Sequence, residues 1–391
     1  MTVRLYYTDA YLLDFTSTIV GRSDDGRRVY LAETAFYPTS GGQPHDLGTL
    51  GGARVVDVID EDARIAHLLD AAVDEHDRSV RGSVDGPRRA DNMQQHTGQH
   101  LLSALFDDLF GFGTLSVHFG ADSSTVDLDA ESIGRTQLRQ AEARANEIVA
   151  ASRAVTVTFE NAVSATGLRK PTDRTGEIRV VSIDGIDRSA CGGTHVRSTA
   201  EIGPVLLRST EKIRRATRVE FVCGRRALQC ARNDFELLAD ISATMSASQD
   251  QLAALIRTQG ERLRNAESAG RKLEKELAVF RVRAMFDAAT ADAKGVRTIT
   301  VHDATSMDEL RVLAQAAFAL PRVVVIGTLR EPWSVLLASS EDSGVECGSI
   351  LKERLGALGG RGGGSPRIAQ GTVPSEAALA QLLETLQQRQ G

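Results

Sequence analysis

The feature that most constrains this chain is a short segment, residues 189–196, which reads SACGGTHV. It places a cysteine and a histidine four residues apart, at Cys191 and His195. The two glycines between them disfavour a regular helix, so we expect a tight loop that turns both side chains toward one point. A thiolate and an imidazole held in this way are two candidate metal ligands.

A second pair of candidate ligands lies far upstream, in the segment HTGQHLL at residues 96–102. On a helix, its two histidines would share one face because they are four residues apart. Each segment alone is a weak signal, and both in one chain are a much stronger one. One sulfur and three nitrogens suit tetrahedral zinc, so the sequence predicts one Zn²⁺ held by His96, His100, Cys191 and His195.

These two segments resemble the editing domain of alanyl-tRNA synthetases and the free-standing AlaX proteins, and the threonyl-tRNA synthetase editing domain shares the metal pattern. Residues 35–44, AFYPTSGGQP, match the glycine-rich stretch ahead of the AlaX editing site. Residues 359–366, GGRGGGSP, with AQG at 369–371, resemble the C-terminal domain of alanyl-tRNA synthetase, the DHHA1 type. The landmarks follow the family's order along nearly the whole chain, which is therefore identified as a member similar to the long form of AlaX.

Composition places the chain among ordinary globular proteins, with 42% hydrophobic and 25% charged residues. Its 391 residues suggest two to four domains. We see no signal peptide and no apolar run of membrane-spanning length, so no membrane partner is expected. Four cysteines make no disulfide framework in a chain this long, which favours a reducing cytoplasm in which Cys191 stays free for metal.

The pattern of strands and helices predicts a multidomain α+β protein with four domains. Residues 1–88 carry short apolar runs between turns and predict a small β-barrel domain that contains the glycine-rich motif. Residues 89–226 predict a zinc-containing editing domain, whose first helix would have Asp91 as its N-cap. Residues 227–292 show apolar positions at heptad spacing and predict a helical hairpin or coiled coil, followed by a DHHA1-like α/β domain at 293–391.

The resemblance implies the substrate and the reaction. The substrate would be tRNA(Ala) mischarged with serine or glycine, and the reaction would hydrolyse the ester to the terminal ribose. We therefore predict a zinc-dependent trans-editing aminoacyl-tRNA hydrolase. Zinc could polarise the carbonyl, lower the pKa of a bound water toward about 7, or anchor the amino acid, and the sequence leaves these roles open.

Three other classes of function are alternatives to an editing hydrolase. The first alternative is a non-catalytic tRNA-binding protein whose zinc only fastens a helix to a loop. Aminoacylation is not expected, because the chain starts almost directly at the barrel-like segment. A DHH-type phosphoesterase is not expected either, because the chain has no Asp-His-His motif. The preference between serine and glycine and the tRNA identity elements stay open.

Several residues near the predicted metal are candidates for further roles. Thr97 would face the pocket or cap a backbone carbonyl, and Asp184 and Asp187 would hold a ligand imidazole or belong to a turn. Gly192 and Gly193 would present N–H groups to an oxyanion, or only bend the loop.

The resemblance also suggests residues that bind the substrate. The glycine-rich motif would let the backbone approach the substrate at Gly41, Gly42 and Gln43, or would be a plain loop. Thr114 and Ser116 lie where related proteins place the side chain that recognises the serine hydroxyl, and the register between them is left open.

Contact with tRNA would come from two basic segments. The net charge of −6 argues against a generally basic surface. Locally, residues 208–226 hold seven basic side chains against two acidic ones and could meet a phosphate backbone, with Arg214, Arg215 and Arg218 as candidates. The alternative is a solvated strand pair of alternating charge.

In the last domain, Arg361 and Arg367 flank a glycine loop that would contact RNA or act as a hinge. The heptad seam would pair within a hairpin or between two chains, which would give a homodimer through the C-terminal half. The oligomeric state is therefore left open by the sequence.

Overall fold

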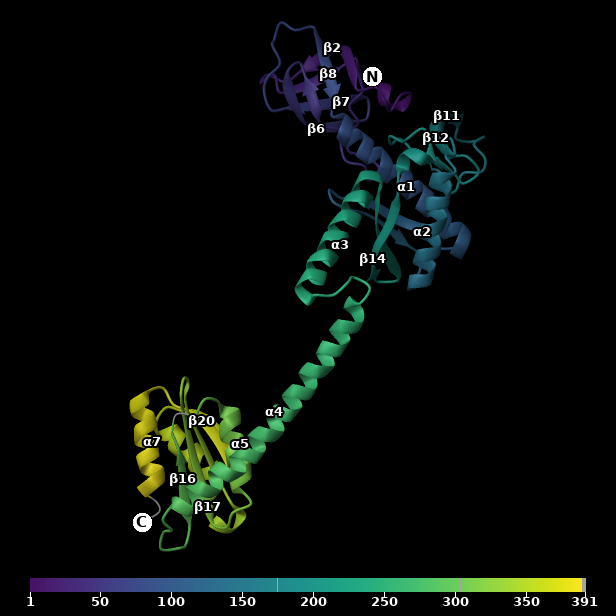
Figure 1. Ribbon diagram of the computed structural model, residues 1–391. Coiled ribbons are helices and arrows are strands. Elements are labelled where there is room, and N and C mark those ends of the chain that lie inside the picture. Colours follow the sequence, from purple (N-terminus) through teal and green to yellow (C-terminus); the bar gives the residue numbers. More distant parts are fainter. Residues whose placement is uncertain (174, 303, 389–391) are drawn as a thin grey trace. The chain divides into compact units, whose positions relative to one another are not determined.

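The computed structural model describes residues 1–173, 175–302 and 304–388, which fall into two compact units, Met1–Thr244 and Met245–Gly391 (Figure 1). Each unit has its own buried apolar clusters. Helices and several sheets occur together, so the chain is a multidomain α/β protein. Among the described residues, no helix has both the length and the apolar character that crossing a membrane requires.

Six short strands near the N-terminus close into a barrel in the order β2-β3-β7-β6-β5-β8. Their apolar residues alternate, as in β3, where Val29 and Leu31 are buried, and the inward side chains make one cluster. Strands β1 and β4 form a separate parallel pair, and the short helix η1 follows β1 along the chain. The bounds are β1 (Val3–Arg4), η1 (Leu5–Tyr7), β2 (Asp14–Arg22), β3 (Arg28–Leu31), β4 (Glu33–Thr34), β5 (Gly48–Leu50), β6 (Ala53–Glu61), β7 (Arg64–Leu69) and β8 (Ser79–Val84).

Helix α1 (Gly86–Phe110) follows the barrel and carries the histidine pair. It begins earlier than the sequence predicted. Asp85, not Asp91, is the N-cap, and its carboxylate accepts a hydrogen bond of 3.0 Å from the N–H of Arg88. Pro87 fits the first turn because its missing N–H would have no helical partner there. Asp91 instead lies inside the helix and binds Arg226.

Two antiparallel sheets and helix α2 complete the framework around α1. One sheet has the order β14-β15-β10-β9 and the other β11-β12-β13. Leu101, Leu102 and Phe106 of α1 are fully buried in the cluster that these elements share. The bounds are β9 (Thr114–Phe119), β10 (Ser124–Leu128), α2 (Arg135–Ala150), β11 (Val155–Asn161), β12 (Glu177–Ile183), β13 (Asp187–Ala190), η2 (Thr199–Ile202), β14 (Val205–Ile213), β15 (Ala216–Cys223) and α3 (Gly224–Met245).

The second unit is a five-stranded sheet between two helical layers, in the order β16-β17-β18-β20-β19. Alternate residues of β17 face opposite layers, with Val325 among the residues clustered with α4 and α5, and Val324 among those clustered with α6 and α7. The bounds are α4 (Leu252–Ala288), β16 (Arg297–Val301), α5 (Met307–Ala317), β17 (Val323–Arg330), β18 (Trp333–Ser339), η3 (Glu341–Ser343), α6 (Cys347–Ala357), β19 (Arg361–Gly364), β20 (Ile368–Thr372) and α7 (Glu376–Gln388).

The segment predicted as a glycine loop is instead strand β19, which pairs with β20 at the edge of the sheet. Its glycines let the hairpin lie against α6. A Cβ at Gly362 would fall 2.7 Å from Cδ1 of Leu355, and one at Gly348 would fall 2.7 Å from the carbonyl oxygen of Gly364. Only a residue without a side chain fits such approaches, so the glycines have a packing role.

The heptad positions of α4 behave differently along its length. Of the predicted seam, Leu252 is buried, whereas Leu263, Leu273 and Phe280 are exposed; the residues of α4 that pack in the second unit, such as Val282, lie off the seam. The boundary between the two units falls at the end of α3, between Thr244 and Met245. The helical hairpin over residues 227–292, and with it the division into four domains, therefore remains a prediction.

Candidate metal centre

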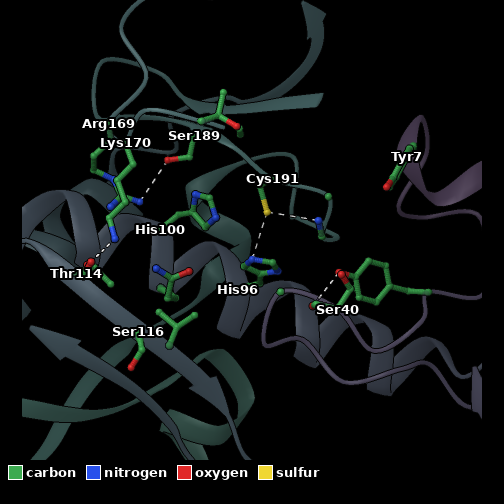
Figure 2. A pocket seen from close by; sticks show the side chains of 18 of the residues that line it. Tyr7, Ser40, His96, His100, Thr114, Ser116, Arg169, Lys170, Ser189 and Cys191 are labelled. Atoms are coloured by element: carbon green, nitrogen blue, oxygen red, sulfur yellow. Dashed lines mark hydrogen bonds between the residues drawn. The ribbon is translucent and has the colours of Figure 1, made fainter. Parts of the chain in front are cut away.

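Helix α1 and the loop after β13 bring the four predicted ligands together. His96 and His100 stand one turn apart on α1, and the ligand atoms of all four residues lie within 4.8 Å of one another. Sγ of Cys191 is 3.4 Å from Nε2 of His96 (Figure 2) and 3.4 Å from Nε2 of His195. Ligand atoms of a tetrahedral zinc stand about 3.5 Å apart, given Zn–S near 2.3 Å and Zn–N near 2.0 Å. The cluster could therefore hold a metal ion.

Each of the three imidazoles is oriented through its other ring nitrogen. In every case Nδ1 lies at hydrogen-bond distance from a buried side chain, which leaves Nε2 for a metal. An amide oxygen and a carboxylate can only accept, so His96 and His100 donate from Nδ1. The pairs are His96 with Oε1 of Gln43 at 2.8 Å, His100 with Oδ2 of Asp187 at 2.8 Å, and His195 with Oγ1 of Thr97 at 3.1 Å.

Asp187 is the most strongly anchored of these partners. Its carboxylate accepts from Nε of Arg169 at 2.6 Å and from the hydroxyl of Ser189 at 3.0 Å, besides His100. Burial raises the pKa of Asp187, but the hydrogen bond and charge of His100, with Arg169, bring it down to about 2. Asp187 is therefore an anion that holds a ligand imidazole, one of the two readings that the sequence left open.

Two of the four candidate ligands already have the protonation state that binds a metal, whereas His100 would have to lose a proton. Burial raises the pKa of the Cys191 thiol, yet His96 and His195 lower it well below its usual range. Burial, then the charge of His96, lowers the pKa of His195 to about 3, so this imidazole is neutral at pH 7. Burial also acts against protonation of His100, but Asp187 and Cys191 raise its pKa to about 9. A thiolate and a neutral imidazole are the forms in which these residues bind metals.

The two glycines of the metal loop have different surroundings. A Cβ at Gly193 would overlap the ring of His96 and fall 3.0 Å from Oε1 of Gln43, so only glycine lets the loop lie on that ring. The N–H of Gly193 donates to Sγ of Cys191 at 3.4 Å. Gly192 lines the cavity beside the cluster, and no hydrogen bond from its N–H to a described residue is found. The oxyanion role of these N–H groups remains a prediction.

The glycine-rich motif forms a tight turn that carries Gln43 into the site. Gly41 and Gly42 have φ of 56° and 86°, and both Ser40 and Gln43 donate backbone N–H groups across the turn. A two-residue turn with both φ positive matches type I′, which explains the glycine pair. Gly41 lines the cavity, whereas a Cβ on Gly42 would meet Phe119 at 3.4 Å.

Gln43 itself is buried and links the barrel to the metal loop. Its Oε1 accepts from His96 and from the N–H of Thr194 at 3.1 Å, and its Nε2 donates to Oγ1 of Thr194 at 2.8 Å. All of these contacts are to protein, so the structure gives Gln43 a positioning role. Its predicted substrate contact is not among them and remains a prediction.

A cavity of about 540 Å³ opens onto the cluster (Figure 2). That volume lies in the range of small-molecule sites. Cations and tyrosines form much of its wall, and three of the four candidate ligands, His96, His100 and Cys191, form its floor. Besides the metal loop, the lining includes Arg4, Tyr6, Tyr7, Tyr37, Pro38, Asp60, Gln99, Thr114, Ser116, Arg169 and Lys170.

The two candidate readers of a serine hydroxyl differ in their bonds. The hydroxyl of Thr114 is buried and donates to Oγ of Ser103 at 2.7 Å. The hydroxyl of Ser116 donates to Oδ2 of Asp127 at 2.6 Å, and Asp127 in turn pairs with Arg218. Ser116 is thus tied to an ion pair, and both residues still line the cavity.

The basic segment is partly neutralised by acids distant in sequence. Three of its arginines make ion pairs, and Arg214 and Arg215 are exposed at the β14–β15 turn. Arg225 lies beyond the other end of β15, roughly 25 Å away for a strand of this length. The predicted basic segment is therefore not one patch. The ion pairs are Arg208 with Asp234, Arg218 with Asp127, and Arg226 with Asp91.

Arg361 and Arg367 also lie apart. Arg361 begins β19, opposite Thr372, whereas Arg367 precedes β20 at the other end of that hairpin. The guanidinium of Arg367 stacks over the ring of Phe318 at 4.5 Å from its centroid. RNA contact by these two residues remains a prediction, and they would have to make it separately.

One residue that shapes the site was missed by the sequence interpretation. Arg179 on β12 is buried and donates to the carbonyl oxygens of Cys191 at 2.8 Å, Gly193 at 2.9 Å and Tyr7 at 3.0 Å. It fixes the path of the metal loop by satisfying its carbonyl groups. An arginine in an otherwise apolar strand is the signal that could have indicated a buried role.

Comparison with known proteins places this fold and site among accessory domains of tRNA synthetases. The family model described as "Threonyl and Alanyl tRNA synthetase second additional domain" matches residues 178–219, and the DHHA1 domain matches residues 295–390. The chain is 30% identical to the alanyl-tRNA editing protein AlaX-L of Pyrococcus horikoshii, over 96% of each chain. It therefore belongs to the AlaX-L family of alanyl-tRNA editing proteins, as the motifs predicted.

Two further relatives agree with this assignment. The alanyl-tRNA editing protein Aarsd1 of Danio rerio is 29% identical over 70% of this chain and 71% of its own length. The alanine–tRNA ligase of Korarchaeum cryptofilum is 28% identical over 96% of this chain, which spans 44% of that ligase.

Proposed function

We propose that this protein is a trans-editing aminoacyl-tRNA deacylase that hydrolyses the ester of Ser-tRNA(Ala), and also that of Gly-tRNA(Ala). The observation that carries this proposal is the His₃Cys cluster at the floor of the cavity, in a chain of the alanyl-tRNA editing family. The cavity has the volume for an amino acid ester together with part of the terminal nucleoside.

Zinc is the metal that suits the donor set. Three imidazole nitrogens and one thiolate, with Sγ 3.4 Å from two of the nitrogens, match a tetrahedral zinc and are too soft a set for magnesium or calcium. His96, His100, Cys191 and His195 would hold it. When bound, zinc supplies Lewis-acid chemistry or a polarised water.

The remaining residues of the cavity would bind and orient the substrate. Tyr7 and Tyr37 offer aromatic surface, and Arg4 and Lys170 offer positive charge, as the end of an RNA strand requires. Thr114 is the better candidate for the serine hydroxyl, because it is buried and bonded only to the neutral hydroxyl of Ser103, whereas Ser116 is exposed and donates to the Asp127 carboxylate. A site that hydrogen-bonds the serine hydroxyl would discriminate against alanine, which lacks it.

The decisive experiment measures deacylation of Ser-, Gly- and Ala-tRNA(Ala) by the purified full-length protein, together with its zinc content. We expect hydrolysis of the first two substrates, with Ala-tRNA(Ala) largely spared.

Cys191→Ala and His100→Ala should lose zinc and activity, whereas Cys230→Ala on α3 serves as the matched cysteine control. Thr114→Val should lower the ratio of the serine rate to the alanine rate, and Ser116→Ala should not. Tight tRNA binding without any hydrolysis would favour the alternative, a non-catalytic tRNA-binding protein with a structural zinc.

The C-terminal half would recruit tRNA and do no chemistry. The exposed apolar positions of α4, among them Leu263 and Leu273, suit a coiled-coil contact, which between two chains would give a homodimer. Sedimentation of the full-length protein and of Leu263→Glu tests the dimer. Affinity for uncharged tRNA(Ala) of Arg361→Ala and Arg367→Ala tests the contact with RNA.

A further inference from the structure

A second cavity, of about 510 Å³, lies where helices α1 and α3 begin. It is separate from the metal cavity but close to it, because Phe119 lines it and the ring of Phe119 lies 5.1 Å from that of His96. None of its lining residues belongs to the metal cavity. We call this second cavity the helix-start cavity.

Its wall offers hydrogen-bond donors without partners. Asn92 is 4% exposed, and its Nδ2 is buried with no hydrogen-bond partner among the described residues. Arg88 uses only Nε, in a bond of 3.1 Å to the carbonyl oxygen of His45. Arg225 is exposed, and no ion pair or hydrogen bond of its guanidinium to a described residue is found. A buried amide without a partner is costly, so these donors indicate a ligand that accepts hydrogen bonds.

The acidic residues of the same wall are already occupied. The carboxylate of Asp85 caps the N–H of Arg88 at 3.0 Å. Asp91 pairs with Arg226, whose Nη2 lies 2.6 Å from Oδ2 and whose Nη1 donates to the carbonyl oxygen of Gly120 at 2.8 Å. With Arg88, Arg225 and Arg226 against Asp85 and Asp91, the wall has a net charge of +1. The N-termini of two long helices add positive potential, so the cavity suits an anion.

We propose that the helix-start cavity binds a backbone phosphate of the tRNA substrate. This proposal rests on the proposed function, which supplies a polynucleotide as the ligand. Asn92 and Arg88 precede His96 by four and eight residues, which on a helix is about 6 Å and 12 Å. A phosphate held this close to the metal cluster belongs to a nucleotide near the aminoacylated ribose. The cavity would therefore set how far the aminoacylated end reaches toward the metal.

The test compares two substrates of the full-length protein, Ser-tRNA(Ala) and seryl-adenosine, which carries the same ester without any phosphate. Arg225→Ala should raise KM for Ser-tRNA(Ala) roughly threefold to tenfold with kcat little changed. It should also reduce the slope of log affinity for uncharged tRNA(Ala) against log salt by about 0.7 to 0.9, the loss of one phosphate contact. Asn92→Asp should raise KM further, because it places a carboxylate against the phosphate. The quantity compared between variants is the ratio of kcat/KM for Ser-tRNA(Ala) to kcat/KM for seryl-adenosine.

Arg232→Ala is the matched control, because Arg232 is an exposed arginine on the same helix, outside this cavity. Equal effects of Arg225→Ala and Arg232→Ala would overturn the proposal. So would equal losses on both substrates, which would mean that the changes act through α1 and its metal ligands. The proposal would also be contradicted if inorganic phosphate inhibited hydrolysis of seryl-adenosine but not hydrolysis of Ser-tRNA(Ala). If the wild type hydrolyses neither ester, the proposed function has failed, and the salt slope of tRNA binding still tests the cavity.

Discussion

Two glycine-rich segments of this chain look alike in sequence and differ in what surrounds them. In the metal loop, Gly193 lies against the ring of His96 and the amide of Gln43. In strand β19, Gly362 lies against Leu355 of α6 and the neighbouring strand. Both positions exclude a side chain, but the first close approach positions a metal ligand and the second packs a helix on a sheet. The absence of a side chain is thus a packing requirement, and the neighbours determine whether function depends on it.

The largest effect that would test this comparison is expected from Gly193→Ala. An added Cβ would displace the loop from His96, and overpacking of about 3 kcal/mol corresponds to zinc binding weakened by about 100-fold. Competition with a chelator, followed by elemental analysis, measures this. Gly192→Ala is the matched control, because its Cβ would meet only Tyr7, at 3.4 Å. Unchanged zinc affinity in Gly193→Ala would show that the glycine of the metal loop, like Gly362, has only a packing role.

The next effect concerns the residues that orient the ligands. Asp187→Asn should lower zinc affinity about 10- to 100-fold, because the anion that holds His100 is lost while the shape is kept. Zinc affinity and secondary structure should be measured together. Asp184→Asn is the control, since Asp184 is exposed and lies outside the cluster. A pair of variants with equal affinities would show that Asp187 does not act on the metal.

In the second unit, Gly362→Ala should lower the free energy of unfolding by about 2 kcal/mol and leave zinc affinity unchanged. The expected cause is displacement of α6 from the β19–β20 hairpin. Gly363→Ala is the control, because a Cβ there would meet nothing within 4 Å. Denaturant unfolding followed with a probe in the second unit measures the difference. A loss of zinc in Gly362→Ala would contradict a purely structural role.

The smallest effect is expected from Glu309 in the second unit, a carboxylate whose pKa is lowered as that of Asp187 is in the first unit. Hydrogen bonds from Arg281 at 2.8 Å and from the N–H of Thr305 at 2.9 Å lower the pKa of Glu309 to about 2. Because the folded pKa lies below that of the unfolded chain, this stabilisation is complete above about pH 4.5 and is lost as pH falls toward 2. Allowing for solvent screening, Glu309→Gln should cost about 1 kcal/mol at pH 7.

The difference in unfolding free energy between wild type and Glu309→Gln should then shrink as the pH is lowered from 5 to 2, with zinc affinity at pH 7 unaffected. Urea unfolding at several pH values measures it. A difference that stays constant with pH would mean that Glu309 contributes through packing and not through its charge.

The sequence by itself determined the family, the four residues of the candidate metal cluster and much of the secondary structure. Spacings of four residues and alternation of apolar residues are local properties, and local geometry translates them directly into a helix face or a strand face. His96 and His100 share a helix face for this reason, and Val29 and Leu31 share the inside of the barrel.

Only the tertiary structure decided which partners these residues have. Gln43 reaches His96 across 53 positions, and Asp187 reaches His100 across 87. The same holds for Arg218. Its partner Asp127 is 91 positions away, and this ion pair offsets the positive charge of Arg218. Such contacts depend on how whole elements pack, and no local pattern encodes the partner. Close approach also turned the expected glycine loop into strand β19, because α6 had to lie directly on it.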